Sequence, residues 1–320
     1  RGQFRTAPRD GTASKFTIAF GGGAAYLPYK ERMWRTIEQA APNLLLLLGD
    51  NVYIDDPTNE PYQRFLYYRR QCQPDFRRLT ASVATYSIWD DHDFGKNDCH
   101  GGPEIDLPPW KIPVWEVYRN NWVNPAYGGG RNDRGCWYVF QRGDVKFYML
   151  DGRYYRDPKP TNGTAPTMLG ATQKKWLKQE LKNSKAKLNV LCSPVPFSGG
   201  NPDKWTGFVA ERDEIFTFIE DNDIRGVLLL SADRHRSDLL VHRRPNGRRY
   251  FEFMSSKLTN HHTHRPANEN DGALYSYNKL CSFGLVTFDT TDRSKSRIGY
   301  QVININGEQV FEFNTSVEHQ

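Results

Sequence analysis

Short apolar runs alternate with amphipathic stretches over the first three quarters of the chain. Six of these runs have the length and uniform hydrophobicity of strands that are covered on both faces. They occupy residues 16–20, 44–48, 85–89, 145–150, 188–192 and 227–230. Between them, apolar residues recur with a helical period at Met33, Trp34 and Ile37, at Trp176, Leu177 and Leu181, and at Phe208, Val209, Ile215, Phe216 and Ile219. Alternating strands and helices predict an α/β fold.

The last part of the chain has a different pattern, with strand-like runs and no helices between them. These runs cover residues 239–242, 250–254, 285–288, 297–305 and 308–313. Asn306-Gly307, between the last two, is a strong signal for a two-residue hairpin turn. We therefore expect an antiparallel portion, about residues 239–320, that completes a second sheet.

Two intervening stretches, residues 57–79 and 96–135, are rich in aromatic, proline and polar residues and have weak periodicity. We interpret them as ordered excursions over the ends of the sheets. The whole chain has 320 residues, enough for one large domain, and no apolar stretch approaches the 18 or so residues of a membrane span.

The formal net charge of +6 is modest for this length, and basic residues are scattered except in Arg243–Arg249. Because this cluster contains Pro-Asn-Gly between two strand-like runs, an exposed hairpin tip is favoured over a nucleic-acid patch. Specific nucleic-acid binding is therefore not expected, and the oligomeric state is left open. The five cysteines lack the spacing of zinc sites, and one disulfide of undetermined pairing remains open.

Aspartates follow four of the strand-like runs within three residues. Asp50 comes directly after five consecutive leucines and a glycine. In open α/β sheets, ligand crevices lie beyond the carboxyl ends of such strands. Taken alone, Gly49-Asp50-Asn51 could equally be a turn after a core strand, since all three residues favour turns.

The residue types at these strand ends suit a metal site. Asp50, Tyr53, Asp91, Asp233 and His235 supply carboxylate, phenolate and imidazole, which suit Fe, Mn, Zn or Ca. Clustered acids cannot all stay ionised without cations, because like charges raise one another's pKa. Each acid alone would more readily be a turn residue or a helix N-cap. Considered together, they favour two or more bound metal ions.

Trp89-Asp90-Asp91-His92-Asp93 is the densest part of this pattern. A helix cap needs one side-chain oxygen, so three acids around one histidine indicate more than capping. Neighbouring carboxylates favour protonated His92, which suits a general acid or a donor to a phosphoryl oxygen. The alternative is a structural hydrogen bond at a tight turn.

Another histidine group lies near the C-terminal strands. His262 and His264 have the strand-like spacing needed for joint metal binding. The polar residues 265–270 that follow favour an exposed loop instead, and this is the interpretation that we prefer.

The chain resembles the PhoD-like alkaline phosphatases over roughly residues 15–290. The motifs that carry the resemblance, in the family's order, are Gly49–Tyr53, Trp89–Asp98, Leu150–Asp157, Leu169–Leu177, Asp203–Phe208 and Ser231–His235. The resemblance implies a calcineurin-like metallophosphoesterase fold, with two packed mixed β-sheets flanked by helices. It also implies hydrolysis of phosphate monoesters, and often diesters, in a periplasmic or secreted protein that uses iron with calcium, or with Mn, Zn or Mg.

The resemblance also implies roles for individual residues. Asp50 would bridge the metals and Tyr53 would bind the ferric-type ion. Asp91, Asp233 and His235 would be further ligands, and His92 would contact the phosphate. Asn97 and Arg153, counted with His92 and Asp91 as catalytic residues, would contact the metals or the substrate, or support the residues that do.

The sequence departs from the family at several points. Gly22-Gly23 stands where many members have Ser-Cys with an iron-binding thiolate, which leaves the metal identities open. Gly21-Gly22-Gly23-Ala24-Ala25 could instead form a phosphate cradle of backbone amides. Ala232 replaces a usual glycine, a change that a negative φ would allow. Residues 1–14 resemble the linker that follows the family's N-terminal β-sandwich, so we expect residues 15–320 to form a single catalytic domain.

These observations predict a metal-dependent phosphoesterase, an alkaline phosphatase and/or phosphodiesterase, in which a metal-activated hydroxide attacks phosphorus. A serine hydrolase is disfavoured, because Ser193 lacks a Gly-x-Ser-x-Gly elbow. The alternative from another class is a catalytically impaired phosphate- or sugar-binding domain that keeps the fold.

Overall fold

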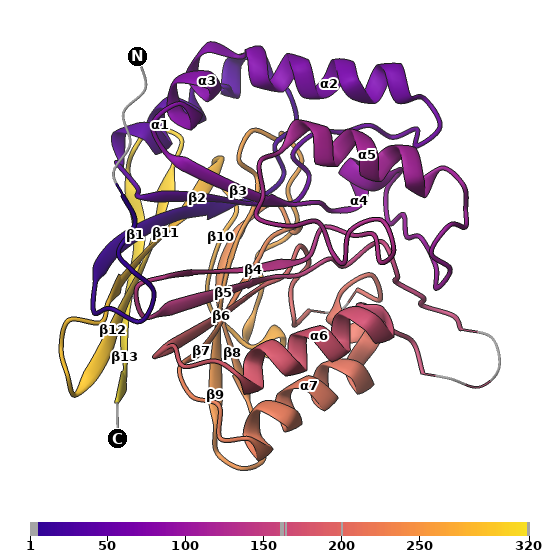
Figure 1. Cartoon of the computed structure of the whole chain (residues 1–320). Helices are drawn as coiled ribbons and strands as arrows, with labels where there is room; N and C mark the ends of the chain where they lie inside the picture. Colours follow the sequence, from indigo (N-terminus) through magenta and orange to yellow (C-terminus); the bar gives the residue numbers. More distant parts are fainter. Residues whose placement is uncertain (1–5, 161–162, 164, 200, 319–320) are drawn as a thin grey trace.

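Two β-sheets pack face to face in the computed structural model, which describes residues 6–160, 163, 165–199 and 201–318 (Figure 1). The first sheet has six strands in the order β13-β12-β11-β1-β2-β3. They are β1 (Lys15–Gly21), β2 (Leu44–Leu48), β3 (Ala84–Ile88), β11 (Ser282–Asp289), β12 (Lys295–Asn304) and β13 (Gln309–Glu318). Strands β1, β2 and β3 are parallel, and the other pairings are antiparallel.

The second sheet has seven strands in the order β10-β8-β9-β7-β6-β5-β4. They are β4 (Tyr138–Arg142), β5 (Val145–Met149), β6 (Leu188–Cys192), β7 (Val227–Ser231), β8 (Ser237–Arg243), β9 (Arg249–Ser255) and β10 (Ala273–Tyr277). Strands β5, β6, β7 and β9 are parallel. Strands β4, β8 and β10 pair antiparallel, so this sheet is mixed like the first. Two mixed sheets were predicted.

The main hydrophobic core joins the two sheets. Phe20 and Leu46 of the first sheet and Phe147 and Val190 of the second are fully buried in one cluster. The leucines of β2 are buried along the whole strand, because parallel strands inside such a sandwich are covered on both faces. This burial fixes where β2 ends, and therefore where Asp50 begins.

The C-terminal portion differs from the prediction of a single antiparallel addition. Strands β8, β9 and β10 complete the seven-stranded sheet, whereas β11, β12 and β13 complete the six-stranded one. In addition, β9 pairs with β7 in parallel. The hydrophobic pattern of a strand does not specify its partner, so the division between sheets was not visible in the sequence. The predicted hairpin between β12 and β13 is confirmed, with Gly307 at φ 84°.

Helices cover the outer faces of the sandwich (Figure 1). The long helices are α2 (Glu60–Cys72), α5 (Lys111–Asn121), α6 (Gly170–Lys182) and α7 (Val209–Asp221). The shorter elements are η1 (Pro28–Lys30), α1 (Met33–Gln39), α3 (Pro74–Thr80), α4 (Asp91–Phe94), η2 (Trp205–Phe208) and η3 (Glu269–Asp271). Leu177 and Ile215 pack against Leu191 and Leu229 in a second core cluster, which places α6 and α7 against the seven-stranded sheet.

The aromatic-rich excursions contain helices that the sequence analysis did not predict. Helix α2 buries Gln63 and Arg70 beside Leu66 and Tyr67, so its buried face is partly polar. A partly polar face weakens the hydrophobic period on which helix prediction depends. The local start signal is nevertheless present, because the side chain of Asn59 accepts a hydrogen bond from the amide of Tyr62.

Several smaller expectations can be compared with the structure. The arginine-rich segment forms the β8–β9 connection, where Arg244 pairs with Glu220 and Arg248 pairs with Asp223. All five cysteines lie in described parts of the chain and are free thiols. No helix among the described residues is both long and apolar enough to cross a membrane.

Residues 6–14 of the predicted linker lack helix and strand, and residues 1–5 lie outside the described residues. This segment contacts the sandwich at two points. The amide of Gly11 donates to the carbonyl of Gly143 at 2.8 Å, and that of Ser14 donates to Thr290 Oγ1 at 2.9 Å. Its role as a linker stays a prediction.

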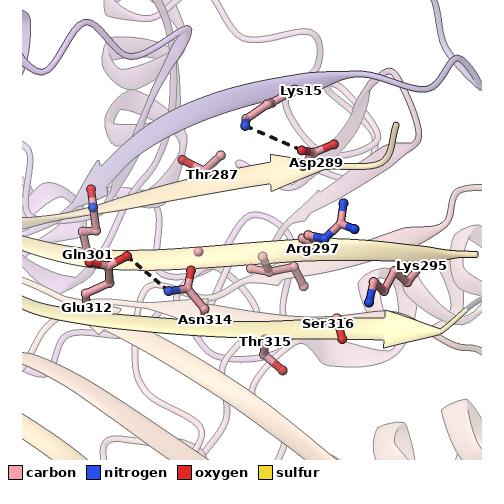
Figure 2. A pocket seen from close by; sticks show the side chains of 12 residues that line it. Lys15, Thr287, Asp289, Lys295, Arg297, Gln301, Glu312, Asn314, Thr315 and Ser316 are labelled. Atoms are coloured by element: carbon pink, nitrogen blue, oxygen red, sulfur yellow. Dashed lines mark hydrogen bonds and ion pairs between the residues drawn. The ribbon is translucent and has the colours of Figure 1, made fainter. Parts of the chain in front are cut away.

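A hollow lies on the six-stranded sheet, over strands β11 to β13 (Figure 2). Its lining is polar and includes Lys15, Asp289, Arg297 and Glu312. Lys15 Nζ lies 3.6 Å from Asp289 Oδ2. The predicted site residues are absent from the lining, so this hollow is separate from the predicted site.

Candidate active site

The predicted metal ligands meet at the carboxyl ends of parallel strands from both sheets. Asp50 follows β2, Asp91 follows β3, and Asp233 and His235 follow β7. Three of them have left-handed backbones, with φ of 53° at Asp50, 69° at Asp233 and 48° at His235. This conformation is costly for residues other than glycine, and such residues cluster at functional sites.

Asp50, Tyr53 and His235 form one part of the site. The Tyr53 hydroxyl donates to Asp50 Oδ2 at 3.0 Å and lies 3.4 Å from His235 Nε2. His235 Nε2 lies 3.8 Å from Asp50 Oδ2. Burial, with Asp91 and Asp233 nearby, raises the pKa of Asp50 to about 7 despite the favourable effects of His92 and Tyr53. Burial also lowers the pKa of His235 to about 4, so its imidazole is neutral at neutral pH.

His92 projects from the first turn after β3, beside Asp50 and Asp91. Its Nδ1 lies 2.8 Å from Asp55 Oδ1, and its ring centroid is 4.3 Å from that of Tyr53. Burial opposes protonation, but Asp50, Asp91 and Asp55 outweigh it and raise the pKa of His92. The predicted protonated histidine is therefore favoured by three carboxylates.

Asp90, Asp91 and Asp233 form an acidic group in which one oxygen of each lies within 4.8 Å of the others. Asp90 Oδ2 is buried and has no hydrogen-bond partner in the described part of the chain. Lys204 Nζ lies 2.5 Å from Asp233 Oδ2 and 3.2 Å from Asp203 Oδ2. The lysine thus supplies one positive charge to this cluster.

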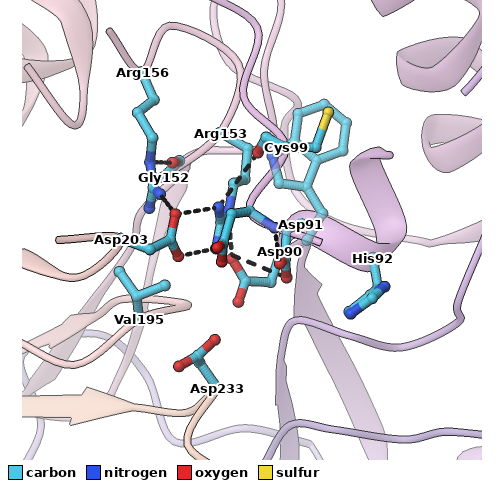
Figure 3. Close-up of polar contacts among 12 residues, drawn as sticks. Asp90, Asp91, His92, Cys99, Gly152, Arg153, Arg156, Val195, Asp203 and Asp233 are labelled. Carbon is cyan, nitrogen blue, oxygen red and sulfur yellow. Dashed lines mark hydrogen bonds and ion pairs between the residues drawn. The ribbon is translucent and has the colours of Figure 1, made fainter. Parts of the chain in front are cut away.

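Arg153 is a buried organising residue. Its Nε donates to Asp90 Oδ1 at 2.5 Å, and its Nη atoms donate to Asp203 at 3.0 and 2.9 Å (Figure 3). Arg156 also pairs with Asp203. Because Arg153 is fully buried and its guanidinium contacts these carboxylates, its place in the structure is that of a positioning residue. Asn97 is exposed, on the loop after α4, and its predicted role is not tested.

Asp93 and Asp151, two acids in the motifs that carry the resemblance, hold the loops in place by hydrogen bonds to backbone amides. Asp93 accepts hydrogen bonds from the amides of Asn51, Val52 and Asp90, which ties the loop after β2 to the loop after β3. Asp151 Oδ1 accepts from the amide of Arg153 at 2.8 Å and thereby shapes the turn that carries this arginine. Buried carboxylates that accept several backbone N–H groups are strong local braces.

Four residues without a predicted role also contact the site: Asp55, Asp203, Lys204 and Asn260. Asp203 and Lys204 lie in Asp203–Phe208, one of the motifs that carry the family resemblance, so this motif could have indicated their place at the site. Asn260 Nδ2 donates to the Tyr53 hydroxyl at 2.7 Å across 207 positions of sequence. No local pattern predicts a contact between such distant residues.

Two amides of the glycine-rich segment after β1 are already used within the fold. The amide of Gly23 donates to the carbonyl of Gly49, and that of Ala24 to the carbonyl of Asp50. These two donors are therefore not available to the predicted phosphate cradle. Ala232 is not among the described non-glycine residues with positive φ, so its β-carbon is tolerated as expected.

The donor set fits bound cations. Orphaned buried polar atoms remain at Asp90 Oδ2 and His235 Nδ1, which have no hydrogen-bond partner within the described chain. Leaving such atoms unpaired is costly, and cations would satisfy them. Three groups have suitably close donor atoms: Asp90, Asp91 and Asp233; Asp50, Asp91 and His92; and His235, His262 and His264.

Two packed mixed sheets flanked by helices, with carboxylates and imidazoles at the strand ends of both, are the architecture that the resemblance predicted. The family model described as PhoD-like phosphatase matches residues 19–309. The chain therefore belongs to the PhoD-like phosphatase family, as the resemblance of its motifs predicted.

The chain is similar to alkaline phosphatase D of Bacillus subtilis (strain 168), with 30% identity over 287 residues, 74% of this chain. It spans about half of that relative, 48% of its length. Among solved structures, that of PhoD gives a TM-score of 0.75 at 19% identity, covering 97% of this chain and 70% of the other. GAP50, the anchor in the inner membrane complex of Plasmodium, gives 0.61 at 10% identity, covering 96% and 90%. These structural matches support the fold alone.

Proposed function

We propose that the chain is a metal-dependent phosphoesterase that hydrolyses small phosphate monoesters, diesters or both. The observation that carries this proposal is the convergence of Asp50, Asp91, Asp233 and His235, with orphaned donor atoms, at the ends of strands from both sheets. The family assignment supports a phosphatase activity for such a site.

Two or more metal ions would be held by Asp50, Tyr53, Asp91, Asp233 and His235. Iron with calcium is the combination that the family resemblance implies, and Mn, Zn or Mg would also suit these ligands. When bound, such ions would lower the pKa of a water molecule and polarise a phosphoryl oxygen.

The residues of the chain have complementary tasks in this proposal. Protonated His92, held by Asp55 and packed against the tilted ring of Tyr53, would donate a proton or hydrogen bond to the phosphate ester. Lys204 would partly neutralise the acidic cluster, which otherwise repels an anionic substrate. Arg153 would hold Asp90 and Asp91 in place.

The alternative of a phosphate- or sugar-binding domain without turnover predicts affinity but no hydrolysis.

The family resemblance also supports a protein that works outside the cytoplasm, and we propose that location. Residues 15–320 would form its catalytic domain.

The proposal is tested by hydrolysis of p-nitrophenyl phosphate and bis(p-nitrophenyl) phosphate at alkaline pH. The native protein, Asp50→Ala and Asp91→Asn are compared before and after chelation and re-addition of single ions. We expect turnover that is lost on chelation, restored by particular ions and strongly reduced in both variants. Phosphate binding without turnover under any metal condition, by folded native protein, would establish the binding domain instead.

A further inference from the structure

Three imidazoles converge beside the acidic cluster. His235 follows β7, whereas His262 and His264 lie on the segment between β9 and η3. One nitrogen of each lies within 4.8 Å of the other two. The ring centroids are 5.3 Å apart for His235 and His262, 5.9 Å for His235 and His264, and 4.7 Å for His262 and His264. The loop is exposed at His261, His262 and Thr263, as predicted, and it also brings His262 and His264 to the site.

Hydrogen bonds hold the loop in this position. The amide of His262 donates to Asn260 Oδ1 at 2.9 Å, and the same Asn260 side chain donates to Tyr53. Thr263 Oγ1 donates to the carbonyl of His235 at 2.8 Å, and Asn278 Nδ2 donates to the carbonyl of His264 at 3.0 Å. These bonds use backbone atoms of the histidines and leave their imidazoles directed to the shared group.

His235 provides an independent indication of a ligand. The residue is 8% exposed, and its Nδ1 atom is buried without a hydrogen-bond partner in the described residues. Its Nε2 atom faces Tyr53 and Asp50. A cation at Nδ1 would therefore satisfy the unpartnered atom and leave the protonated Nε2 facing the Asp50 carboxylate, since metal-ligating histidines donate their second ring N–H to such partners.

The surroundings leave room for this ring and give it a mixed electrostatic setting. A β-carbon at Gly23 would lie 2.9 Å from His235 Cδ2, so a glycine at position 23 gives the imidazole its place. Asp233 favours a positive charge near His235 and His264, whereas Arg234 near His264 and Lys257 near His262 oppose it. Imidazole nitrogens suit a transition metal, whereas calcium takes oxygen ligands, so the donor atoms of this group favour a transition metal over calcium.

We propose that His235, His262 and His264 form a transition-metal site, with Zn²⁺ as the preferred type of ion and a fourth position open. Three imidazoles with one open position are a known zinc arrangement in proteins, whereas hard ions prefer oxygen ligands. The neighbouring Asp90, Asp91 and Asp233 group, made of oxygen ligands, would take the hard cation. The chain would thus separate two kinds of ion within one crevice.

The test measures binding and does not depend on turnover. Metal-stripped protein is titrated with Co²⁺, a spectroscopic substitute for Zn²⁺, and visible absorption reports coordination by nitrogen ligands. The native protein is compared with His262→Ala, His264→Ala and His264→Gln. His261→Ala is the matched control, because His261 is exposed, adjacent and outside the three-histidine group. Thermal melting confirms that each variant is folded.

We expect native protein and His261→Ala to bind Co²⁺ equally, with absorption that excess Ca²⁺ leaves unchanged and Zn²⁺ displaces. Each variant at position 262 or 264 should bind Co²⁺ more weakly by at least the roughly 10–100-fold that loss of outer partners costs a metal site. Equal Co²⁺ affinity and spectra in all variants, or displacement by Ca²⁺, would overturn the inference. Either result is independent of whether the protein hydrolyses phosphate esters.

Discussion

The Lys204 ammonium lies 2.5 Å from Asp233 Oδ2, inside the group of carboxylates at the strand ends. Lys204 is 2% exposed, so this is a buried charge pair. Burial opposes the charge of the lysine, but Asp233, Asp203 and Asp90 outweigh it and raise its pKa. The lysine thus acts as an internal cation for acids that would otherwise repel one another.

Replacing Lys204 by methionine should destabilise the metal-stripped protein by about 3 kcal/mol, because the buried acids lose their partner. Saturating divalent ions should raise the unfolding free energy of Lys204→Met more than that of the native protein. In the variant, the bound metal ion does not have to displace the Lys204 ammonium from Asp233. Thermal unfolding with chelator and with added ion measures both effects. Lys178→Met, which removes a surface pair with Glu214, is the control and should show little change. Equal ion-induced stabilisation of the native protein and Lys204→Met would contradict this account.

Asp203 holds two buried arginines, and Figure 3 shows its carboxylate facing Arg153 and Arg156. Burial opposes its ionisation, but Arg153, Arg156 and Lys204 lower its pKa well below the usual range. Asp203→Asn should therefore cost roughly 3–5 kcal/mol of unfolding free energy, because buried cations lose their counter-charge. Urea unfolding measures the change.

The matched control is Asp223→Asn, which removes exposed pairs with Arg225 and Arg248 and should leave the unfolding midpoint nearly unchanged. If Asp203 positions Arg153, hydrolysis by Asp203→Asn should also fall under conditions where the variant remains folded. Normal turnover in folded Asp203→Asn would show that Arg153 keeps its place without this carboxylate.

The strand ends were predictable because they depend on local sequence. Five consecutive leucines favour a strand covered on both faces, and Asp50 then lies just beyond its carboxyl end. The same argument places Asp91 and Asp233. The metal-ligand set could therefore be proposed from residue type and position alone.

The partners of those residues could not be predicted in this way. Asp203 meets Arg153 across 50 positions, and Asn260 meets Tyr53 across 207, through loops without periodicity. The spacing of His262 and His264 suits joint metal binding, but the polar residues that follow favoured an exposed loop. The approach of both histidines to His235 depends on the pairing of β9 with β7, which no strand pattern specifies.

Gly23 allows a test of the space beside His235. At φ +67°, a β-carbon would lie 2.9 Å from His235 Cδ2 and 3.0 Å from the amide nitrogen of Lys257. Gly23→Ala should thus combine backbone strain of about 1–2 kcal/mol with displacement of the imidazole. Gly102→Ala has comparable strain, at φ +73°, but meets nothing within 4 Å.

We therefore expect both glycine variants to lose thermal stability. Only Gly23→Ala should also lose Co²⁺ affinity and hydrolytic activity under conditions where the variant is fully folded. Titration and activity at a temperature where both variants are folded measure this difference. Equal Co²⁺ affinity in the two variants would mean that displacement of the His235 imidazole does not affect metal binding.

The pH dependence of stability should reveal the uncompensated acids of the metal-stripped protein. Burial, Asp91 and Asp233 raise the pKa of Asp50 to about 7, while the unfolded group titrates near 3.8. Between these values the folded state holds the extra proton, so the unfolding free energy falls as pH rises from about 4 to about 7. The loss attributable to Asp50 is on the order of 4 kcal/mol. Asp93, whose pKa burial and Asp50 raise to about 7, adds a slope of the same sign.

Urea unfolding between pH 4.5 and 8 in chelator measures this slope. Asp50→Asn should remove at least half of it, because the variant loses one titrating group and relieves the repulsion on Asp93. A saturating divalent ion should also flatten the slope in the native protein, since a bound cation favours the ionised carboxylates. His92, whose pKa Asp50, Asp91 and Asp55 raise, also contributes stability that is lost at higher pH, so part of the slope that Asp50→Asn removes comes from His92. An unchanged slope in Asp50→Asn would place the source of the pH dependence outside this cluster.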